Sequence, residues 1–341
     1  MLETVLSTLR SLATLTALAA IVLACGAPTI SAPAATPSRA ASSPSAVPAA
    51  RGDIAFVTSM PGARPTIFRT DVATGVVARV VDGEDPDWSP DGSRLAFTRQ
   101  GPAGPQIWVI DRDGGSQVVI GDGFGPVWSP GGGQIAFSRS QIDVADLLVM
   151  NSDGTGVRGL AGGGDFSWSP DGARLATVTG DATPELIVVD SDGSVSARLA
   201  AGKQPSWSPD GTGIAFVNWS TGQIQVVGLA TGDAVAVSRA VTDAYGPAWS
   251  PDGKHLAFIS WQGDLYVASV EGGDPVRVTN GLKAASVPVW SPDGAWIALT
   301  VDSVEAAQTS NIWLVPADGS EGRPLTTTGN DRQPAWRPVA P

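Results

Sequence analysis

Short apolar runs recur along the chain, separated by turns rich in Gly, Pro and Asp. After residue 53, one run has the form Leu/Ile-Ala-Phe, as in Leu95–Phe97, and the next resembles Ile107–Val109. These runs are rich in β-branched residues and bounded by turn residues, so they predict strands. No long stretch of this part repeats its apolar residues with the period of a helix. The pattern therefore predicts an all-β domain.

One five-residue phrase, Trp-Ser-Pro-Asp-Gly, recurs with a period of 39 to 46 residues when its variants are included. Full copies begin at Trp88, Trp168, Trp207, Trp249 and Trp290, and variants begin at Trp128 and Trp336. The phrase predicts a tight turn, because Pro sets φ, Asp bonds its own backbone and Gly accepts positive φ. Gly131 replaces the Asp at the Trp128 copy, so we expect a looser turn there. A period near 40 is typical of supersecondary units that stack on copies of themselves.

Each repeat supplies four strands in about 41 residues, the content of a β-propeller blade with four antiparallel strands. The first strand of a repeat ends at the tryptophan, and the second is the Leu-Ala-Phe run. The first unit, from Ile54, has a second, third and fourth strand but no first strand before them. The strand at Trp336 is a first strand that is not followed by a second, third and fourth strand. We therefore expect a seven-bladed ring closed by the C-terminal strand. A six-bladed ring is the alternative if a terminal unit is degenerate.

The pattern Ser-Pro-Asp-Gly-x-x-Leu-Ala-Phe, as at Ser89–Phe97, resembles the repeats of the TolB C-terminal propeller and of related WD-like bacterial β-propellers. The resemblance covers about Asp53 to Pro338, and six turns carry it. TolB has six blades and an additional N-terminal α/β domain, for which this chain has neither the room nor the pattern. The resemblance therefore implies the propeller fold, but not the role of TolB in the Tol–Pal system.

Residues 1–24 are interpreted as a lipoprotein signal peptide. The apolar run Ser11–Leu23 is too short for an ordinary spanning helix and precedes Ala24 and Cys25, the only cysteine. We expect cleavage before Cys25 and lipidation of its thiol. Residues 25–52, rich in Ala, Pro and Ser, are then a disordered tether, and residues 53–338 form the propeller. The protein is predicted to be exported and anchored to the cell envelope at its periplasmic or extracytoplasmic face, with the lipid as its only membrane contact.

The composition excludes several kinds of site. A net charge of −12 disfavours binding to nucleic acid or to anionic lipid. The single histidine, His255, is expected in an exposed turn, which excludes most sites that need histidine ligands or a histidine base. Turns such as Asp111–Gly114 lack the later ligands of a calcium loop and are interpreted as hairpin turns. We expect no metal, no cofactor and no enzymatic activity, with a cation at the channel mouth as an alternative.

Two sets of loops emerge on the same face of a propeller: those between the fourth strand and the next first strand, and those between the second and third strands. In this chain they are acidic and carry aromatic residues, including Trp219 and Trp261. Such a face suits a basic or polar protein, peptide or glycan. The candidate binding residues are Asp85, Asp87, Asp122, Phe124, Asp165, Phe166, Lys203, Asp243, Tyr245, Asp331 and Arg332.

Three functions remain open. The first is a monomeric, non-enzymatic scaffold that binds an unidentified envelope protein or peptide through this face. The second is a carbohydrate-binding or carbohydrate-active propeller, because paired carboxylates can hydrolyse glycosidic bonds without histidine. Asp87, Asp165 and Asp243 would carry that chemistry. The third is a module that senses a small ligand, and nothing in the sequence separates it from the first.

Overall fold

Strands make up all of the helix-or-strand structure in the part of the chain that is described. The computed structural model describes residues 48–139, 146–180, 182–303 and 309–339, all within one compact unit, Ala46–Pro341. These residues form strands β1 to β27 and contain no helix long and apolar enough to cross a membrane. The all-β prediction is confirmed. The predicted signal peptide, Cys25 and residues 25–47 of the predicted tether lie outside the described residues.

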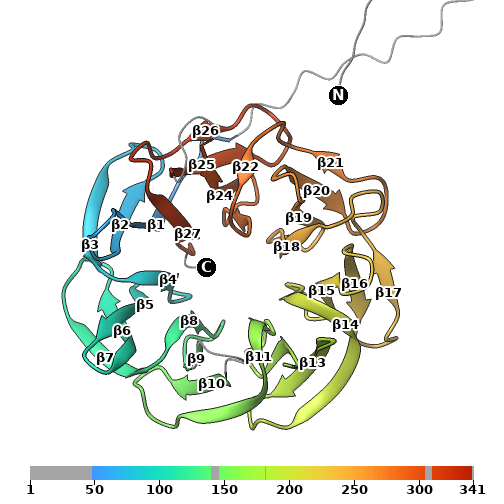
Figure 1. Ribbon diagram of the computed structural model, residues 1–341, viewed down its shortest axis with the longest axis horizontal. Helices are drawn as coiled ribbons and strands as arrows, with labels where there is room; N and C mark the ends of the chain where they lie inside the picture. The colour runs from blue at the N-terminus through green and yellow to red at the C-terminus, as the bar shows by residue number, and fades with distance from the viewer. Residues whose placement is uncertain (1–47, 140–145, 181, 304–308, 340–341) are drawn as a thin grey trace, which may run out of the picture. The chain divides into compact units, whose positions relative to one another are not determined.

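The strands pair antiparallel in repeated units of about four, here called blades, which Figure 1 shows arranged around a common centre. One blade contains, in order, β27 (Asp331–Trp336), β1 (Asp53–Thr58), β2 (Thr66–Asp71) and β3 (Val77–Asp82). The next contains β4 (Glu84–Trp88), β5 (Arg94–Gly101), β6 (Gly104–Asp111) and β7 (Gln117–Asp122). The innermost strand of such a blade ends at a repeat tryptophan, so the repeats of the sequence and the blades of the fold coincide.

The following blades merge into one ten-stranded sheet. Its strands are β8 (Phe124–Trp128), β9 (Gln134–Ser138), β10 (Asp146–Asn151), β11 (Arg158–Trp168), β12 (Arg174–Val178), β13 (Glu185–Asp190), β14 (Val195–Trp207), β15 (Gly213–Asn218), β16 (Ile224–Gly228) and β17 (Ala234–Ala236). The sheet is continuous because β11 and β14 are long: each starts as the outer strand of one blade and ends as the inner strand of the next.

The C-terminal part of the chain forms two further sheets. The first contains β18 (Tyr245–Trp249), β19 (His255–Ile259), β20 (Leu265–Ser269) and β21 (Val276–Arg277). The second contains β22 (Lys283–Ala284), β23 (Val289–Trp290), β24 (Trp296–Asp302), β25 (Ser310–Pro316) and β26 (Arg323–Pro324). The outer strands β21 and β26 have only two residues each, whereas β3 and β7 have six. The outer edges of these two blades are therefore shorter than those of the blades with β3 and β7.

The Ser-Pro-Asp-Gly turn is held by its own side chains. In the first copy, Ser89 Oγ donates to Asp91 Oδ1 at 2.6 Å, and the backbone N–H groups of Ser93 and Arg94 donate to Asp91 and to Ser89. These hydrogen bonds, that from Ser89 first, lower the pKa of Asp91 to about 2. The Gly131 copy keeps the bond from the Gln134 N–H to Ser129 Oγ but has no carboxylate in the turn.

The repeat tryptophans fill the contacts between neighbouring blades. Five of them are buried: Trp88, Trp128, Trp168, Trp207 and Trp336. The indole N–H of Trp168 donates to the carbonyl of Val127 in the preceding blade at 3.2 Å, and that of Trp249 donates to Ser206 at 3.0 Å. Each ring therefore adds apolar burial and, in these copies, a polar link between blades.

The N-terminal boundary of the fold differs from the predicted one. The sequence assigned residues 25–52 to a disordered tether, yet Ala50 is only 5% exposed and packs in the same cluster as Ile54 and Trp336. The indole N–H of Trp296 also donates to the carbonyl of Pro48 at 2.8 Å. Residues 48–52 therefore belong to the packed body. The small Ala side chain fits this contact, whereas the composition of the segment gave no signal for it.

The two ends of the packed body lie side by side. Strand β27 pairs with β1, with Ile54 opposite Trp336. Asp53, at the start of β1, receives ion pairs from Arg337 at 2.7 Å and from Arg112 of the next blade at 3.3 Å. Residues as far as 284 positions apart in sequence are thus joined by a backbone ladder and by the buried carboxylate of Asp53.

Candidate functional site

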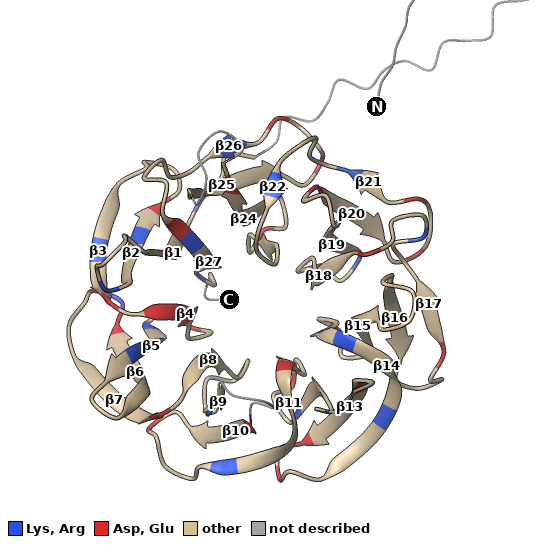
Figure 2. Cartoon of the chain, in the orientation of Figure 1, with Lys and Arg blue, Asp and Glu red and all other residues tan. Residues whose placement is uncertain are grey.

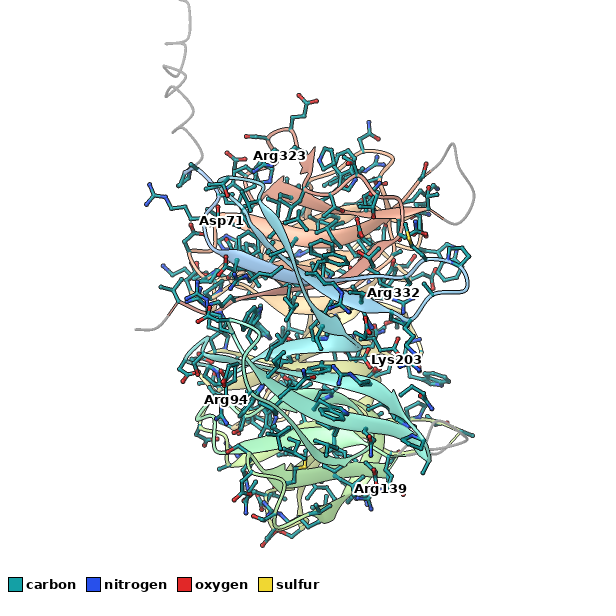
Figure 3. The ribbon with its side chains drawn as sticks, turned by 90° about the vertical axis from the view of Figure 1, so that its left-hand side faces the viewer. Asp71, Arg94, Arg139, Lys203, Arg323 and Arg332 are labelled. Atoms are coloured by element: carbon teal, nitrogen blue, oxygen red, sulfur yellow. The ribbon has the colours of Figure 1, made fainter. Side chains whose placement is uncertain are left out.

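The loops predicted to form a binding face do lie at one end of the molecule. Figure 3 shows Lys203, Arg332 and Arg139 at one side of the view, whereas Asp71 and Arg94 lie at the other. We call the end with Lys203 and Arg332 the loop face. It carries the connections from outer to inner strands, such as Asp82–Glu84, and the hairpin loops between second and third strands, such as Trp219–Gln223. Figure 2 shows acidic residues along β4, close to the centre of the ring.

The inner strands carry a β-bulge three residues before the tryptophan, and these bulges line the centre. Asp85, Gln204 and Gln333 occupy it with φ of 51°, 53° and 53°, glycine occupies it in β8 and β18, and Asp165 stands at this place in β11. Gln333 and Asp85 are joined reciprocally: the Asp85 N–H donates to Gln333 Oε1 at 3.2 Å, and Gln333 Nε2 donates to Asp85 Oδ1 at 2.6 Å. The bulge side chains therefore link neighbouring blades, and Asp85 is engaged in a structural contact.

Asp87 is the second acidic candidate from β4, and it also contacts the next blade. Its Oδ2 accepts a hydrogen bond of 2.7 Å from the backbone N–H of Trp128. Burial raises the pKa of Asp87 to about 7, although the Trp128 N–H bond acts in the opposite direction. Asp87 is thus a carboxyl group that titrates near neutral pH inside a blade contact.

Asp165 and Phe166 border a hollow of about 310 Å³ at the inner strands, together with Gln204. Burial raises the pKa of Asp165, whereas a hydrogen bond from the Gln204 N–H and the charge of Lys203 lower it. The side chain of Gln204 in turn accepts a bond of 3.0 Å from the N–H of Gly246 in the following blade. The hollow is therefore polar, and it is built from the bulges of successive inner strands.

Another hollow of the loop face lies beside this one. It has a volume of about 450 Å³ and is bordered by Lys203, Trp219, Asp243, Tyr245 and Trp261; we call it the aromatic cleft. The two indole side chains are 45% and 78% exposed, which is unusual for tryptophan.

The cleft contains charged groups of both signs. The ammonium of Lys203 lies 5.6 Å from the ring centroid of Trp219, a cation–π contact. The Tyr245 hydroxyl donates to the carbonyl of Ala284 at 2.9 Å, and burial raises the pKa of this phenol. Asp243 is exposed. The cleft thus offers aromatic faces, one ammonium and one carboxylate to a ligand.

The other predicted face residues divide into surface and interior positions. Asp122 is exposed and accepts a bond from Gln106 at 3.3 Å, and Phe124 is half-buried. Arg332 pairs with Glu84 of the next blade at 3.1 Å. Asp331 was predicted to lie on the binding face, but it is fully buried. Its Oδ1 accepts a 2.7 Å bond from Thr58 of β1. It joins β27 to β1 and cannot present its carboxylate to a partner.

The structure brings together only part of the predicted set. Lys203, Asp243 and Tyr245 meet in the aromatic cleft, and Asp165 and Phe166 meet in the neighbouring hollow. The two tryptophans of the cleft were noted as loop residues, but nothing in the sequence showed that loops from two blades would place them at one hollow.

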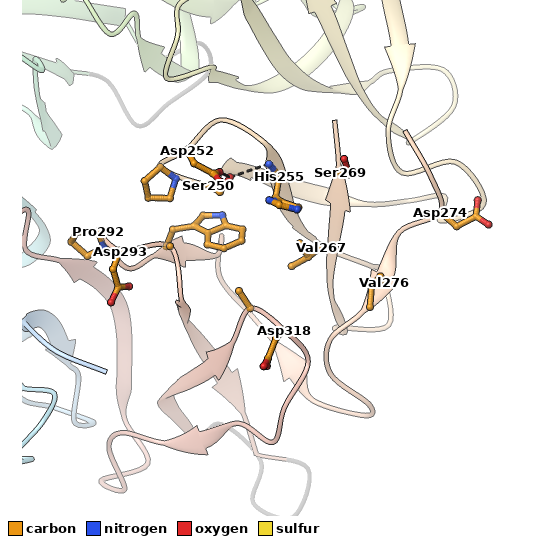
Figure 4. A pocket seen from close by; sticks show the side chains of 14 residues that line it. Ser250, Asp252, His255, Val267, Ser269, Asp274, Val276, Pro292, Asp293 and Asp318 are labelled. Carbon is orange, nitrogen blue, oxygen red and sulfur yellow. Dashed lines mark hydrogen bonds between the residues drawn. The ribbon is translucent and has the colours of Figure 1, made fainter. Parts of the chain in front are cut away.

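A larger hollow, of about 780 Å³, opens at the end opposite the loop face and was not predicted. Trp290, His255, Asp252 and Asp318 line it, as Figure 4 shows. The predicted exposed turn position of His255 is wrong: it is the half-buried first residue of β19, and its backbone N–H donates to Ser250 Oγ at 3.0 Å. The carboxylate of Asp252 is engaged in its own Ser-Pro-Asp-Gly turn.

Among the described residues, no group of three or more His, Cys, Asp or Glu side chains is arranged to hold a metal ion. The predicted absence of a cofactor and the alternative of a cation at the channel mouth both remain predictions.

Comparison with known proteins shows which folds this chain resembles. The family model described as the TolB beta propeller domain matches residues 176–340. The crystal structure of TolB from Acinetobacter baumannii aligns with a TM-score of 0.58 at 18% identity, over 84% of this chain and 67% of that chain. The crystal structure of the oligogalacturonate lyase from Vibrio parahaemolyticus aligns with a TM-score of 0.58 at 14% identity, over 85% of this chain and 93% of that chain. No curated protein matches the chain in sequence.

An acylaminoacyl peptidase also aligns, with a TM-score of 0.59 at 15% identity, over 81% of this chain and 51% of that chain. The chain therefore spans about half the length of that peptidase. These neighbours correct the prediction that the protein is not an enzyme: a lyase and a peptidase share its fold, so the fold does not separate it from enzymes. At such identities the likeness carries the fold alone.

The family model covers the repeats from β12 onward, and the solved TolB structure shares the architecture of most of the chain. The chain therefore has the fold of a TolB-like β-propeller, and its residues 176–340 match the family model of that domain.

Proposed function

We propose that the loop face recognises a protein partner and that the aromatic cleft is its principal contact. The observation that carries this proposal is the pair of exposed indoles, Trp219 and Trp261, at the border of one hollow. Tryptophan is enriched among the residues that dominate binding energy, and an exposed aromatic pair on loops is costly to keep in water without such a role.

The charge of the cleft indicates the chemistry of the partner segment. Lys203 already places its ammonium over Trp219, so that ring face is suited to a cation. Asp243 and the bulge carboxylate Asp165 lie in the two adjoining hollows, and the whole chain carries a net charge of −12. A segment that presents lysine or arginine side chains would be attracted by this field and would compete with Lys203 for the indole.

The experiment uses two synthetic peptides of equal length, one rich in Lys and one rich in Glu, titrated into the purified protein by calorimetry at low salt. We expect the Lys-rich peptide to bind more tightly, and the Trp219→Ala/Trp261→Ala double variant to weaken its affinity about tenfold or more. The control is Val118→Ala/Val235→Ala, which removes two exposed apolar side chains from outer strands. Equal binding of both peptides, or an unchanged affinity in the double tryptophan variant, would refute the proposal.

We also propose that the ring has seven blades and is closed by β27. The pairing of β27 with β1 supports closure, and so do the ion pairs that Asp53 receives from Arg337 and Arg112. Removing residues 329–341 should then abolish cooperative unfolding, because β1 would lose its partner along a whole edge. A truncated chain that melts like the full one would exclude closure.

The proposed location is the cell envelope, with a signal peptide over residues 1–24, a lipid on Cys25 and a tether that holds a monomeric ring away from the membrane. Replacing Cys25 by Ala should move the protein from the membrane fraction to the soluble fraction of the host. Unchanged partition would reject the lipid anchor while leaving the proposed recognition surface intact.

A second candidate is a carbohydrate-active propeller. It is favoured by the raised pKa values of Asp87 and Asp165 and by the fold shared with an oligogalacturonate lyase. The bond from the Trp128 N–H to Asp87 argues for a structural role of that carboxylate, so Asp165 is the better catalytic candidate. Incubation with oligogalacturonate tests it: turnover that Asp165→Asn abolishes and Asp122→Asn preserves would support this function, and no turnover would reject it for that substrate.

A further inference from the structure

A hollow of about 430 Å³ lies between the blade of β1, β2 and β3 and the segment Leu325–Thr328 that follows β26. It is separate from the aromatic cleft and from the hollow beside Asp165, with which it shares no residue. Its volume falls within the usual range for small-molecule sites, about 300–1,000 Å³.

The blade contact beside the hollow differs from three others in one residue. In three other blades a glycine five residues before the tryptophan lies against the phenylalanine ring of the second strand: Gly83 on Phe97, Gly123 on Phe137 and Gly202 on Phe216. A Cβ at these glycines would come within 2.4 to 2.6 Å of the ring. The corresponding residue before Trp336 is Asp331, which is fully buried and whose Oδ1 accepts a 2.7 Å bond from Thr58.

The short outer strand of the preceding blade accounts for part of the opening. Strand β26 contains only two residues, and the chain then turns away through Leu325–Thr328. It therefore leaves part of the facing sheet uncovered, including Phe68 and Val77.

The lining is apolar at its base. Phe56 is 1% exposed and stacks with Phe68 at a ring-centroid distance of 6.0 Å, and Met60, Val77 and Leu325 extend this surface. An apolar chain of a ligand placed here would leave water and contact these side chains. The threonines that complete the lining largely use their hydroxyls within the protein, as Thr58 does with Asp331 and Thr66 with Asp82.

Arg64 is the only charged residue that lines the hollow. No ion pair involves its guanidinium among the described residues, in a chain whose net charge is −12. The carboxylates nearby are engaged: Asp82 pairs with Arg79 at 2.6 Å, and Asp331 is fully buried under Thr58. An unneutralised cation beside an apolar cavity fits a ligand with an apolar body and one anionic end.

We propose that this hollow binds a free medium-chain carboxylate, with its alkyl chain against Phe56 and Phe68 and its carboxylate on the Arg64 guanidinium. A chain of about ten carbons suits a cavity of this size. The proposal does not depend on the aromatic cleft, because the two hollows draw on different blades.

The test titrates sodium decanoate and, separately, decanol into the full chain by calorimetry, below the concentration at which decanoate forms micelles. We expect one binding site per chain and tighter binding of decanoate than of decanol. Arg64→Gln should reduce the decanoate affinity about threefold to fivefold and remove the preference over decanol, because an exposed ion pair contributes little more than this. Arg139→Gln, an exposed arginine on another blade, is the matched control.

A second variant tests the cavity itself without altering charge. Ala63 is exposed at the border of the hollow, so Ala63→Trp should block entry and abolish binding of both ligands, whereas Ala234→Trp on the outer strand β17 should not. Melting curves show whether each variant folds. Binding of decanoate that survives Ala63→Trp, a wild-type protein that prefers decanol, or no binding of decanoate would each overturn the proposal.

Discussion

The carboxylate of Asp87 in β4 accepts the backbone N–H of Trp128 in β8 at 2.7 Å, so a side chain of one blade caps the inner strand of the next. An equivalent contact occurs once more, where Ser167 Oγ accepts the N–H of Trp207 at 3.0 Å. In both places the indole N–H of the tryptophan has no partner among the described residues. At Trp168, Trp249 and Trp290 the indole instead donates to the preceding blade. At five of the blade contacts the tryptophan therefore makes one of two alternative polar links, whereas the indole N–H groups of Trp88 and Trp336 have no partner among the described residues.

Asp87 should make stability fall as the pH rises. Its pKa is about 7 in the folded protein, against an ordinary value of 3.8, so between pH 4 and pH 7 the folded state holds a proton that the unfolded chain has released. Linkage bounds the resulting loss at about 4 kcal/mol. Urea unfolding at pH 5 and pH 8 should show wild type losing stability relative to Asp87→Asn, which keeps an acceptor for Trp128 without ionising.

Asp91 provides the control of opposite sign. Because its pKa is lowered to about 2, its stabilising hydrogen bonds are fully present above pH 4 and are lost as the pH falls toward 2. The difference between wild type and Asp91→Asn should therefore stay constant from pH 5 to pH 8. If wild type and Asp87→Asn also keep a constant difference over that range, the raised pKa of Asp87 is wrong.

The two kinds of blade link predict unequal effects of the same substitution. Trp168→Phe removes a hydrogen bond to the Val127 carbonyl, whereas Trp128→Phe removes an N–H that has no partner. Both lose similar apolar area, so Trp168→Phe should cost about 1 kcal/mol more in the free energy of unfolding. Chemical denaturation of the two variants measures this, and equal losses would show that the indole bond contributes nothing.

Much of the fold was predictable because the same local chemistry recurs in each repeat. Ser89, Asp91 and Gly92 make their turn with bonds inside a few residues, so a pattern in the sequence is sufficient to recognise it. The apolar second strands predicted the buried core in the same way, since Phe97 and its counterparts stand at one place in the period. Structural features that form within a single repeat, such as this turn, could therefore be predicted from the repeat pattern.

The site was less predictable because it arises between repeats. Asp331 was assigned to the binding face from its loop position, but its partner Thr58 lies 273 residues away and becomes a neighbour only when β27 joins β1. The aromatic cleft likewise combines Trp219 of one hairpin loop with Trp261 of the next. The loop positions indicated which residues share one end of the molecule, whereas the contacts there depend on how the blades are packed.

Gly202 should not tolerate a side chain, for a purely steric reason. An added Cβ would lie 2.4 Å from Cδ2 of Phe216, in a ring that is fully buried, although the backbone φ at this glycine is ordinary. Gly202→Ala should therefore lower the free energy of unfolding by about 1–3 kcal/mol. Gly133→Ala is the control, since an added Cβ there meets nothing within 4 Å. Equal melting temperatures for the two variants would contradict this packing.

The Gly131 turn offers a stabilising change. Gly131 stands where the other complete copies have Asp, its φ is not positive, and an added Cβ would meet nothing within 4 Å. Gly131→Asp should place a carboxylate where Ser129 Oγ and the Gly133 N–H can donate to it, as Ser89 and Ser93 do to Asp91.

We expect Gly131→Asp to raise the free energy of unfolding by about 1 kcal/mol, because of the new hydrogen bonds and the lower entropy of the unfolded chain. Gly131→Asn, which lacks the charge, should give a smaller gain, and the gain from Asp should shrink as the pH falls below about 4, where the carboxylate of the unfolded chain begins to take up a proton. Thermal unfolding of the three proteins at pH 7 and pH 3 measures both effects, and a Gly131→Asp variant no more stable than wild type at pH 7 would show that the carboxylate adds nothing to this turn.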